Sequence, residues 1–383
     1  MLTRREWMRK AAVATTVAAM PKMLSGQRPV GTLSKKAQDV TGAGSLEAHA
    51  AARGLLTGCA VNAKLFREDE DFRKLLAEQY SIVVPENCLK WNILRPTSDT
   101  YNFADADSLI AFAEANGMKV RGHNLAWHEA IPAWFAGTVN KDNAQKFLVD
   151  HIHTVAGRYK GKIHSWDVVN EPIYHDNRPD GLRRRPWLDF IGPEYIDLAF
   201  HAAHAADPHA FLVLNECYIE HATPGEIGRR AALLALATRL QKANVPITHV
   251  GIQGHLRGNT PLDRRGMADF GKQIHDLGLE IMITELDCDS VNVPGALVEQ
   301  TAASKYAEFL EFMGPYVKVI TLESLHEDRS LPLQANGFRQ YLNLLNSDYQ
   351  LTPPYYATVD VLALPAAESG QATHLKQSAK GSR

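Results

Sequence analysis

The sequence predicts an α/β protein built as one (β/α)8 TIM barrel, and three observations lead to this prediction. Short runs of β-forming residues alternate with helical patterns between about residues 45 and 360, as in proteins whose strands run parallel. Eight such runs can be counted, which favours a closed barrel over an open doubly wound sheet. No glycine-rich phosphate-binding turn follows the first run, and this argues against a nucleotide-binding fold.

The eight predicted strands are short, and several are apolar almost throughout. Strands of a parallel sheet that are buried on both faces have this composition. In chain order the predicted strands are residues 55–61, 81–84, 119–122, 163–169, 210–214, 249–252, 280–284 and 317–322.

Helical patterns separate the strands. Apolar side chains recur at helical spacing along residues 148–159, 196–203, 267–277 and 306–313, as on the buried face of an amphipathic helix. Gly117, Gly161 and Gly278 each come shortly before a predicted strand. Glycine is common where a helix ends, so these three residues are predicted helix C-caps.

Composition excludes several classes of protein. The 383 residues carry a formal net charge of −2, so the basic footprint of a nucleic-acid-binding protein is absent. No apolar run reaches the roughly 18 residues of a membrane-spanning helix, and four cysteines are too few for a scaffold built on disulfides. We therefore expect no nucleic-acid partner and no membrane span, and we expect a monomer.

Both ends of the chain look different from the barrel. Residues 1–35 are predicted to be a twin-arginine export signal and a flexible segment, because Arg4 and Arg5 precede a modest apolar stretch. The alternative is a short amphipathic helix or a disordered tail. The expected location is exported, periplasmic or secreted. Residues 45–362 are the predicted barrel domain, and residues 363–383 the predicted flexible tail.

Polar residues gather where the predicted strands end, which is where barrel enzymes carry their active sites. A packed rim would not need so many buried polar groups, since each one requires a partner. They lie in residues 85–91, 123–128 and 166–172, and in Asn215-Glu216, Gln253-Gly254-His255 and residues 284–287.

Two carboxylates in this set suggest the chemistry. Glu171 and Glu285 end the fourth and seventh strands, on roughly opposite sides of the barrel mouth. Glycoside hydrolysis needs one carboxylic acid to protonate the leaving oxygen and a second carboxylate to attack the anomeric carbon or to activate water. No metal-binding or cofactor-binding signature accompanies them, so we predict neither a metal nor a cofactor.

Five motifs in this order resemble glycoside hydrolase family 10, the β-1,4-xylanases, over about residues 50–345. Each of the five lies at the end of a predicted strand. They are PENCLKW at 85–91, RGHNLAWH at 121–128, WDVVNE at 166–171, GIQGH at 251–255 and ITELD at 283–287.

The resemblance implies a role for each motif residue. It implies that Glu171 is the general acid/base and that Glu285 is the nucleophile of a retaining mechanism with a covalent glycosyl-enzyme. It further implies that His255 bonds to Glu285, with Asp287 orienting the imidazole, and that Asn170 holds the sugar 2-hydroxyl. The implied substrate-binding residues are Glu86, Asn87, Lys90, His123, Trp127 and Gln253.

The eighth strand end departs from the family pattern. Glu323 and Leu331 stand where the family has two tryptophans, and no Trp follows Trp187. The resemblance still implies a hydrolase that cleaves β-1,4-xylosidic bonds in xylan or xylo-oligosaccharides. The missing tryptophans leave two alternatives: the same mechanism acts on a different or decorated β-glycan, or the chain binds carbohydrate with weak catalysis. We hypothesise that Glu323 contacts the substrate; the alternative is that it points into solvent.

Further alternatives stay open at this point. The fifth strand ends in Asn215-Glu216 where the family commonly has Asn-Asp, and Ala130 stands at a position usually held by Gln. Trp134 and Trp187 are sugar platforms or packing residues. Cys59 and Cys88 form a disulfide, or all four cysteines are free thiols. Endo or exo action is undetermined.

Overall fold

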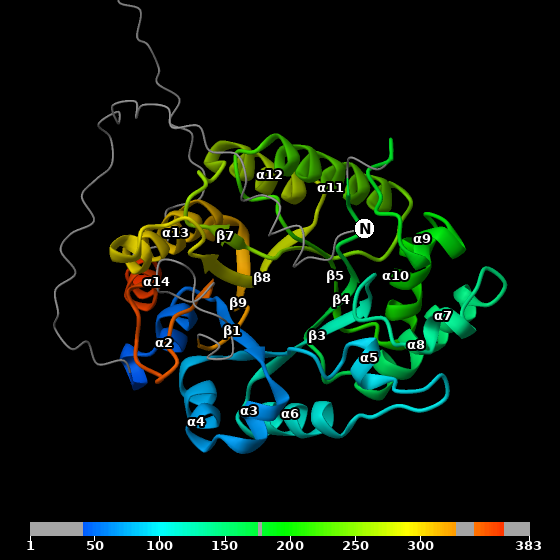
Figure 1. Ribbon diagram of the computed structural model, residues 1–383, viewed down its shortest axis with the longest axis horizontal. Helices are drawn as coiled ribbons and strands as arrows, with labels where there is room; N and C mark the ends of the chain where they lie inside the picture. Colours follow the sequence, from blue (N-terminus) through cyan, green and yellow to red (C-terminus); the bar gives the residue numbers. More distant parts are fainter. Residues whose placement is uncertain (1–40, 175–177, 327–340, 364–383) are drawn as a thin grey trace, which may run out of the picture. The chain divides into compact units, whose positions relative to one another are not determined.

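Eight parallel strands pair edge to edge into a closed barrel in the computed structural model, which describes residues 41–174, 178–326 and 341–363 (Figure 1). The first strand pairs with the second (Gly58 with Ile82) and also with the last (Leu56 with Val319), and this second pairing closes the ring. The strands are β1 (Leu56–Val61), β2 (Ile82–Pro85), β3 (Lys119–Ala126), β4 (Ser165–Asn170), β5 (Phe211–Glu216), β6 (His249–Ile252), β8 (Glu280–Asp289) and β9 (Val317–Leu322).

Two short strands were not predicted, and both extend the sheet at β8. β7 (His255–Arg257) pairs with β8 in parallel, and β10 (Tyr341–Leu342) pairs with it in antiparallel orientation. Each is too short to leave a period-two pattern in the sequence. β7 follows β6 after two residues and brings His255 beside the residues that end β8.

Helices surround the strands (Figure 1). The four predicted helical stretches lie in α8, α10, α12 and α13. The helices among the described residues are α2 (Leu46–Ala51), α3 (Ala63–Glu68), α4 (Glu70–Gln79), α5 (Trp91–Leu94), α6 (Ala104–Ala115), α7 (Phe135–Thr138), α8 (Ala144–Arg158), α9 (Pro186–Ile191), α10 (Tyr195–Ala206), α11 (Pro224–Lys242), α12 (Arg264–Asp276), α13 (Val298–Met313) and α14 (Pro353–Ala363), with 3-10 turns η1 (Gly42–Gly44), η2 (Gly295–Leu297) and η3 (Gly314–Tyr316).

The helix ends follow local sequence chemistry. Asp69 accepts a hydrogen bond from the backbone N–H of Phe72 at the start of α4, and Thr223 accepts one from Glu226 at the start of α11. Such side chains satisfy N–H groups that have no partner within the helix. The predicted C-cap glycines adopt φ of 67°, 77° and 75° at positions 117, 161 and 278. That region favours glycine, and Gly117 and Gly278 directly follow the C-cap residues of α6 and α12, so these two predictions are confirmed. Gly161 lies three residues beyond the end of α8, and its N–H donates to Asp207, so the prediction of a helix cap was wrong there.

All eight predicted strands exist, and most of their ends lie within two residues of the prediction, but two strands run four or more residues further. The third continues past residue 122 to Ala126, and the seventh continues past residue 284 to Asp289. In both, polar side chains such as His123, Asn124 and Asp287 interrupt the apolar run although they are buried. The motif residues therefore lie in the last residues of these strands as well as in the loops that follow them.

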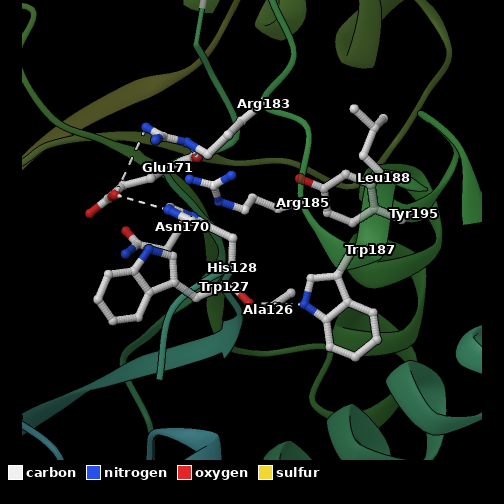
Figure 2. A pocket seen from close by; sticks show the side chains of 10 residues that line it. All are labelled: Ala126, Trp127, His128, Asn170, Glu171, Arg183, Arg185, Trp187, Leu188 and Tyr195. Atoms are coloured by element: carbon white, nitrogen blue, oxygen red, sulfur yellow. Dashed lines mark hydrogen bonds and ion pairs between the residues drawn. The ribbon is translucent and has the colours of Figure 1, made fainter. Parts of the chain in front are cut away.

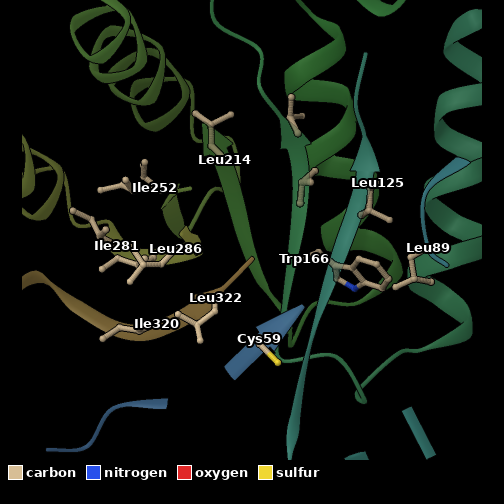
Figure 3. Packing of buried hydrophobic residues seen from close by; sticks show 14 of the residues in the cluster. Cys59, Leu89, Leu125, Trp166, Leu214, Ile252, Ile281, Leu286, Ile320 and Leu322 are labelled. Atoms are coloured by element: carbon tan, nitrogen blue, oxygen red, sulfur yellow. The ribbon is translucent and has the colours of Figure 1, made fainter. Parts of the chain in front are cut away.

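The barrel has an outer and an inner apolar layer. The outer layer fills the space between strands and helices and includes Trp166, Leu214 and Ile252 (Figure 3). A small separate cluster of Ile82, Val213, Met282 and Val319 comes from four of the barrel strands. Successive strand residues alternate between faces. Asp167 therefore points the opposite way from Trp166, toward the barrel interior.

Some predictions fall outside the described residues. The predicted export segment at 1–35 and Leu331 both lie there, as does the predicted tail apart from Ala363, the last residue of α14. Within the described ranges, none of the helices combines the length and the apolar character that crossing a membrane requires.

Candidate active site

Glu171 follows β4 directly, in a backbone conformation that turns its side chain into the barrel mouth. Its φ is 53°, a left-handed value that is uncommon outside glycine and that often marks functional sites. Two bonds hold this conformation. The Glu171 N–H donates to the carbonyl of Asn215 at 2.8 Å, and its own carbonyl accepts from Nε of Arg183 at 2.9 Å.

Three donors surround the Glu171 carboxyl group, which is 12% exposed. Nε2 of Gln253 donates to Oε1 at 3.2 Å, while Nε2 of His128 and a guanidinium nitrogen of Arg183 each lie 4.0 Å from Oε2. The carboxyl group is thus oriented by one amide and flanked by two basic side chains. Its limited exposure leaves one side open to a substrate.

Glu285 lies within β8 and is bound by a different set of groups. Nδ2 of Asn215 donates to its Oε1 at 2.8 Å. Nε2 of His255 lies 3.5 Å from Oε2, and Nδ1 of His123 lies 4.0 Å from Oε1. Burial alone would raise the pKa of Glu285. The His255 contact and the positive charges of His123, His255 and Lys90 outweigh burial and hold this pKa well below its usual value. Glu285 is therefore ionised at neutral pH.

His255 is oriented from behind by Asp287. Its Nδ1 lies 2.9 Å from Oδ1 of Asp287, so the ring presents Nε2 to Glu285. Burial lowers the pKa of His255, but the Asp287 carboxylate, the hydrogen bond to Asp287 and the close approach of Glu285 outweigh that effect and raise this pKa well above the usual value. A protonated His255 adds positive charge beside Glu285.

One chain of side-chain amides joins the two carboxylates. Nδ2 of Asn215 donates both to Glu285 and to Oδ1 of Asn170, the latter at 2.8 Å. The same Asn170 oxygen lies 3.3 Å from Nε2 of Gln253, which also donates to Glu171. The Thr284 hydroxyl donates to Oδ1 of Asn215 at 2.7 Å and so fixes which way that amide faces. The amide chain holds Glu171 and Glu285 in a set geometry.

The predicted sugar-binding residues form a second connected group. Nδ2 of Asn87 donates to Glu86 at 2.7 Å, and Nζ of Lys90 donates to Asn87 at 3.1 Å and lies 5.3 Å from the centre of the Trp127 ring. The Trp127 ring lies 6.3 Å from that of His123. The structure thus brings these five residues together beside Glu285.

A buried ion pair fixes His123 at the base of this group. Asp167 accepts hydrogen bonds from Arg121 and from Nδ1 of His123, the latter at 2.8 Å, and neither Arg121 nor Asp167 is exposed. The Arg121 guanidinium supplies the positive charge that a buried carboxylate requires.

A hollow lies beside Glu171, and two arginines line it together with Trp127 of the sugar-binding group (Figure 2). Arg183 is anchored by hydrogen bonds to the carbonyls of Glu171 and Ile173. Among the described residues Arg185 has no carboxylate partner, and its guanidinium bonds only to the carbonyl of Arg184. The full lining is Ala126, Trp127, His128, Asn170, Glu171, Arg183, Arg185, Trp187, Leu188 and Tyr195.

Sequence reasoning assigned no role to several of these residues. Asn215 stood at a predicted strand end, but its bond joins β5 to Glu285 of β8, 70 residues away in the sequence, and leaves no local signal. Arg183 and Arg185 belong to a run of three arginines in the loop after Glu171, and that run was the available signal. Glu216 ties this loop to β5, because its buried carboxylate accepts the N–H of Ile173 at 2.9 Å.

The structure resolves several alternatives that the sequence left open. Nε1 of Trp187 donates to the carbonyl of Trp127 at 2.9 Å, and its ring packs on Trp91 and Phe135, so Trp187 is mainly a packing residue that borders the hollow. Trp134 packs between Phe135 and Phe147 with Arg95 against its face. All four cysteines are buried free thiols, so the Cys59–Cys88 disulfide is not formed.

Glu323 comes directly after β9, and its carboxyl group reaches the catalytic centre. One oxygen of Glu323, one of Glu285 and a ring nitrogen of His255 lie within 4.8 Å of one another. Of the two alternatives for Glu323, this position favours contact with the substrate over a side chain directed into solvent. Leu331 lies outside the described residues.

Three groups of described side chains have metal-ligand types within 4.8 Å of one another. Glu220, His221 and Glu226 form one group, but Nδ1 of His221 is 2.9 Å from Glu226 and Nε2 accepts the N–H of Arg257 at 3.0 Å. The other two groups both include Glu285. A cation there would compete with the histidines for that carboxylate, so the expectation of no metal stays a prediction.

Comparison with known proteins gives consistent results. Residues 45–361 match Glycosyl hydrolase family 10. The β-1,4-xylanase of Dictyoglomus thermophilum is 37% identical over 260 residues, which cover 65% of this chain and 71% of that protein. An exoglucanase of Acetivibrio thermocellus is 31% identical over 332 residues, covering 82% of this chain and 29% of that protein.

A solved structure agrees with these relatives. Xylanase 10B from Thermotoga petrophila RKU-1, in complex with xylobiose, superposes with a TM-score of 0.75 at 30% identity and covers 83% of this chain and 97% of its own. The family match spans most of the chain, and the fold agrees with it. The chain therefore belongs to glycosyl hydrolase family 10, and the predicted glycosidase with a (β/α)8 TIM-barrel fold is confirmed.

Proposed function

We propose that this chain hydrolyses β-1,4-xylosidic bonds of xylan or xylo-oligosaccharides with retention of anomeric configuration. The observation that carries the proposal is the pair of carboxylates in unlike surroundings, joined by the amide chain of Asn215, Asn170 and Gln253. One carboxyl group is flanked by donors and opens toward a hollow, and the other is held ionised. Retaining hydrolysis needs this division of roles.

In the first step the Glu285 carboxylate attacks the anomeric carbon while the glycosidic C–O bond breaks. Glu171 gives its proton to the leaving oxygen, so the leaving sugar departs as an alcohol and an ester to Glu285 remains. In the second step Glu171 accepts a proton from water, whose oxygen attacks the anomeric carbon and releases Glu285. The Asp287–His255 pair keeps Glu285 ionised between turnovers.

Substrate binding divides between the two sides of the carboxylate pair. We assign the sugar that Glu285 attacks to the group formed by Glu86, Asn87, Lys90, His123 and Trp127, whose amide, ammonium and ring groups suit hydroxyl-rich faces. The leaving sugar would occupy the hollow beside Glu171. Nδ2 of Asn170 would hold the 2-hydroxyl, because its Oδ1 is already occupied by two donors.

The test is hydrolysis of aryl β-xylobioside, aryl β-cellobioside and xylan, with Glu285→Ala, Glu171→Ala and a control at the exposed Glu299 (Glu299→Ala) in parallel. We expect xylobioside turnover that Glu285→Ala abolishes. Azide should rescue Glu171→Ala with an activated aryl glycoside and give a β-glycosyl azide, because azide needs no general base to attack the glycosyl-enzyme. A product of inverted configuration would contradict the mechanism.

A second candidate is the same mechanism on a different or decorated β-glycan. The position of Glu323 in the catalytic centre favours it, because a carboxyl group replaces a flat apolar ring there. Hydrolysis of the aryl β-cellobioside but not of the aryl β-xylobioside would favour this candidate. Oligosaccharide binding without turnover of any substrate would instead select a carbohydrate-binding protein with weak catalysis.

We further propose export by the twin-arginine route and a monomeric state. Arg4 and Arg5 ahead of a modest apolar stretch support export. Fusion of residues 1–45 to a reporter, with Arg4→Lys and Arg5→Lys together as the control, tests export. Light scattering of the purified chain tests the monomer, and a mass of twice 42.4 kDa would contradict it.

A further inference from the structure

Glu323 brings a third carboxyl group into the catalytic centre. It follows β9, and its backbone N–H donates to the carbonyl of Leu286 at 3.2 Å, which ties this residue to β8. Its side-chain oxygen, one of Glu285 and a ring nitrogen of His255 lie within 4.8 Å of one another. The Glu323 side chain is therefore placed where the reacting sugar must lie.

The Glu323 carboxyl group has no fixed partner among the residues that the structure describes. In the described part of the chain no side chain or backbone group makes a hydrogen bond to it. Nε2 of His255 is nearby, but it lies 3.5 Å from Glu285 and makes no hydrogen bond of ordinary geometry. The Glu323 side chain is only partly buried, so its carboxyl group is accessible to a ligand in the catalytic centre.

Four charged groups face Glu323. Glu285 and Asp287 come from β8, His255 from β7, and Lys90 from the turn after β2. Two carboxylates this close do not both ionise without a large repulsion. Burial, followed by the Glu285 charge, raises the pKa of Glu323 to about 8, whereas the pKa of Glu285 is held low. The Glu285–Glu323 pair thus carries one negative charge at neutral pH, and that charge is on Glu285.

We propose that Glu323 is a neutral carboxylic acid in the working enzyme and donates its proton in a hydrogen bond to a hydroxyl of the sugar that Glu285 attacks. A neutral carboxyl group offers one donor and one acceptor and can engage a single hydroxyl through both. This inference rests on the proposed function, because the ligand is the reacting sugar of that mechanism. It makes Glu323 a substrate-binding residue that discriminates sugars by a hydroxyl near β9.

The proposal has a consequence for proton uptake. Above pH 8 the free site has lost the Glu323 proton, so sugar binding must take a proton back from solvent. At pH 8 each binding event should take up about half a proton, and affinity should fall about tenfold between pH 7 and pH 9. A carboxyl group that merely points into solvent predicts neither effect.

The test measures xylotriose binding by titration calorimetry in a Glu171→Gln background, which prevents hydrolysis and removes the titration of Glu171. At pH 8, two buffers of different ionisation enthalpy report the protons taken up. Glu171→Gln should show the uptake and the loss of affinity. The double variant with Glu323→Gln should bind at pH 7 within about threefold, because an amide also donates, with no uptake at pH 8.

Two controls keep the outcomes distinct. A variant with Glu323→Ala should bind weakly at every pH, and thermal unfolding checks that each variant folds. Equal proton uptake in the variants with and without Glu323→Gln would overturn the inference, because the group that takes up the proton would then be a different one, such as His255. Xylotriose binding with no uptake at all would overturn it and leave the proposed function intact. Binding of cellotriose but not xylotriose would overturn the proposed substrate, and the same uptake measurement would then be made with cellotriose.

Discussion

Asn215 donates one hydrogen bond to Glu285, the proposed nucleophile, from Nδ2 to Oε1 at 2.8 Å, and thereby links β5 to β8, its second neighbour in the barrel beyond β6. The same nitrogen donates to Asn170, the residue before Glu171. One amide therefore contributes to the position of both carboxylates. Since the Thr284 hydroxyl fixes its orientation, Asn215 can present only its donor side to Glu285.

Asn215→Ala should lower kcat/KM by about 10- to 100-fold, because a hydrogen bond to a charged group contributes about 1.5–3 kcal/mol. The measurement is steady-state hydrolysis of an aryl β-xylobioside. The exposed Asn92, changed to Ala, is the matched control and should behave as wild type. Thr284→Val removes only the orienting hydroxyl and should have a smaller effect. Equal activity of Asn215→Ala and Asn92→Ala would contradict this role.

Gly251→Ala should impair catalysis through Asn215. A Cβ at position 251 would lie 2.2 Å from Oδ1 of Asn215, so the amide must move. Overpacking of this kind lowers the free energy of unfolding by about 1–3 kcal/mol. Here it would also displace the amide that binds Glu285. Hydrolysis rate and urea denaturation measure the two effects. Gly137→Ala is the control, because nothing lies within 4 Å of its added Cβ. Wild-type hydrolysis rates in both variants would contradict the prediction that the added Cβ displaces the Asn215 amide.

The stability of the protein should depend on the protonation of His255. Its pKa is raised in the folded state, so its contribution is complete below the unfolded pKa of about 6.5 and is lost as pH rises through the folded value. Each unit of this pKa difference corresponds to about 1.4 kcal/mol. We expect the free energies of unfolding of wild type and His255→Gln, measured in urea, to differ most below the unfolded pKa and to converge as pH rises through the raised folded pKa. A constant difference across that range would show that His255 stabilises by packing alone.

Arg185→Ala should weaken binding of the leaving sugar. Arg185 lines the hollow beside Glu171 without a carboxylate partner among the described residues. We expect a rise of about tenfold in KM for xylotetraose, as for the loss of one charged hydrogen bond, and a smaller change for an aryl xylobioside. The neighbouring Arg184 is exposed and provides the control variant Arg184→Ala. An equal KM change for both substrates would place Arg185 outside the leaving-sugar site.

The sequence predicted the strands and the two carboxylates because both leave local signals. Apolar runs mark buried strands, and 249–252 and 317–322 match β6 and β9 at both ends. The extensions of β3 and β8 were missed because polar side chains at their ends are buried by contacts with neighbouring strands, such as His123 with Asp167 and Asp287 with His255. The same reason hid Asn215, whose partners Glu285 and Asn170 are remote in sequence. The position of Glu323 at the end of the eighth strand was predictable from the sequence. Its proximity to Glu285 was not, because it depends on how the closed barrel brings β8 and β9 together.

The ring closure between β1 and β9 also orders events during protein synthesis. The ribosome makes β1 long before β9, so until the last barrel strand has emerged, the edge of β1 that pairs Leu56 with Val319 stays open. An unpaired strand edge is a site of association with other chains. Glu323 follows β9 directly, so the nascent chain cannot assemble the catalytic centre before the edge has closed. Protection from aggregation and competence for catalysis therefore arrive together, late in synthesis.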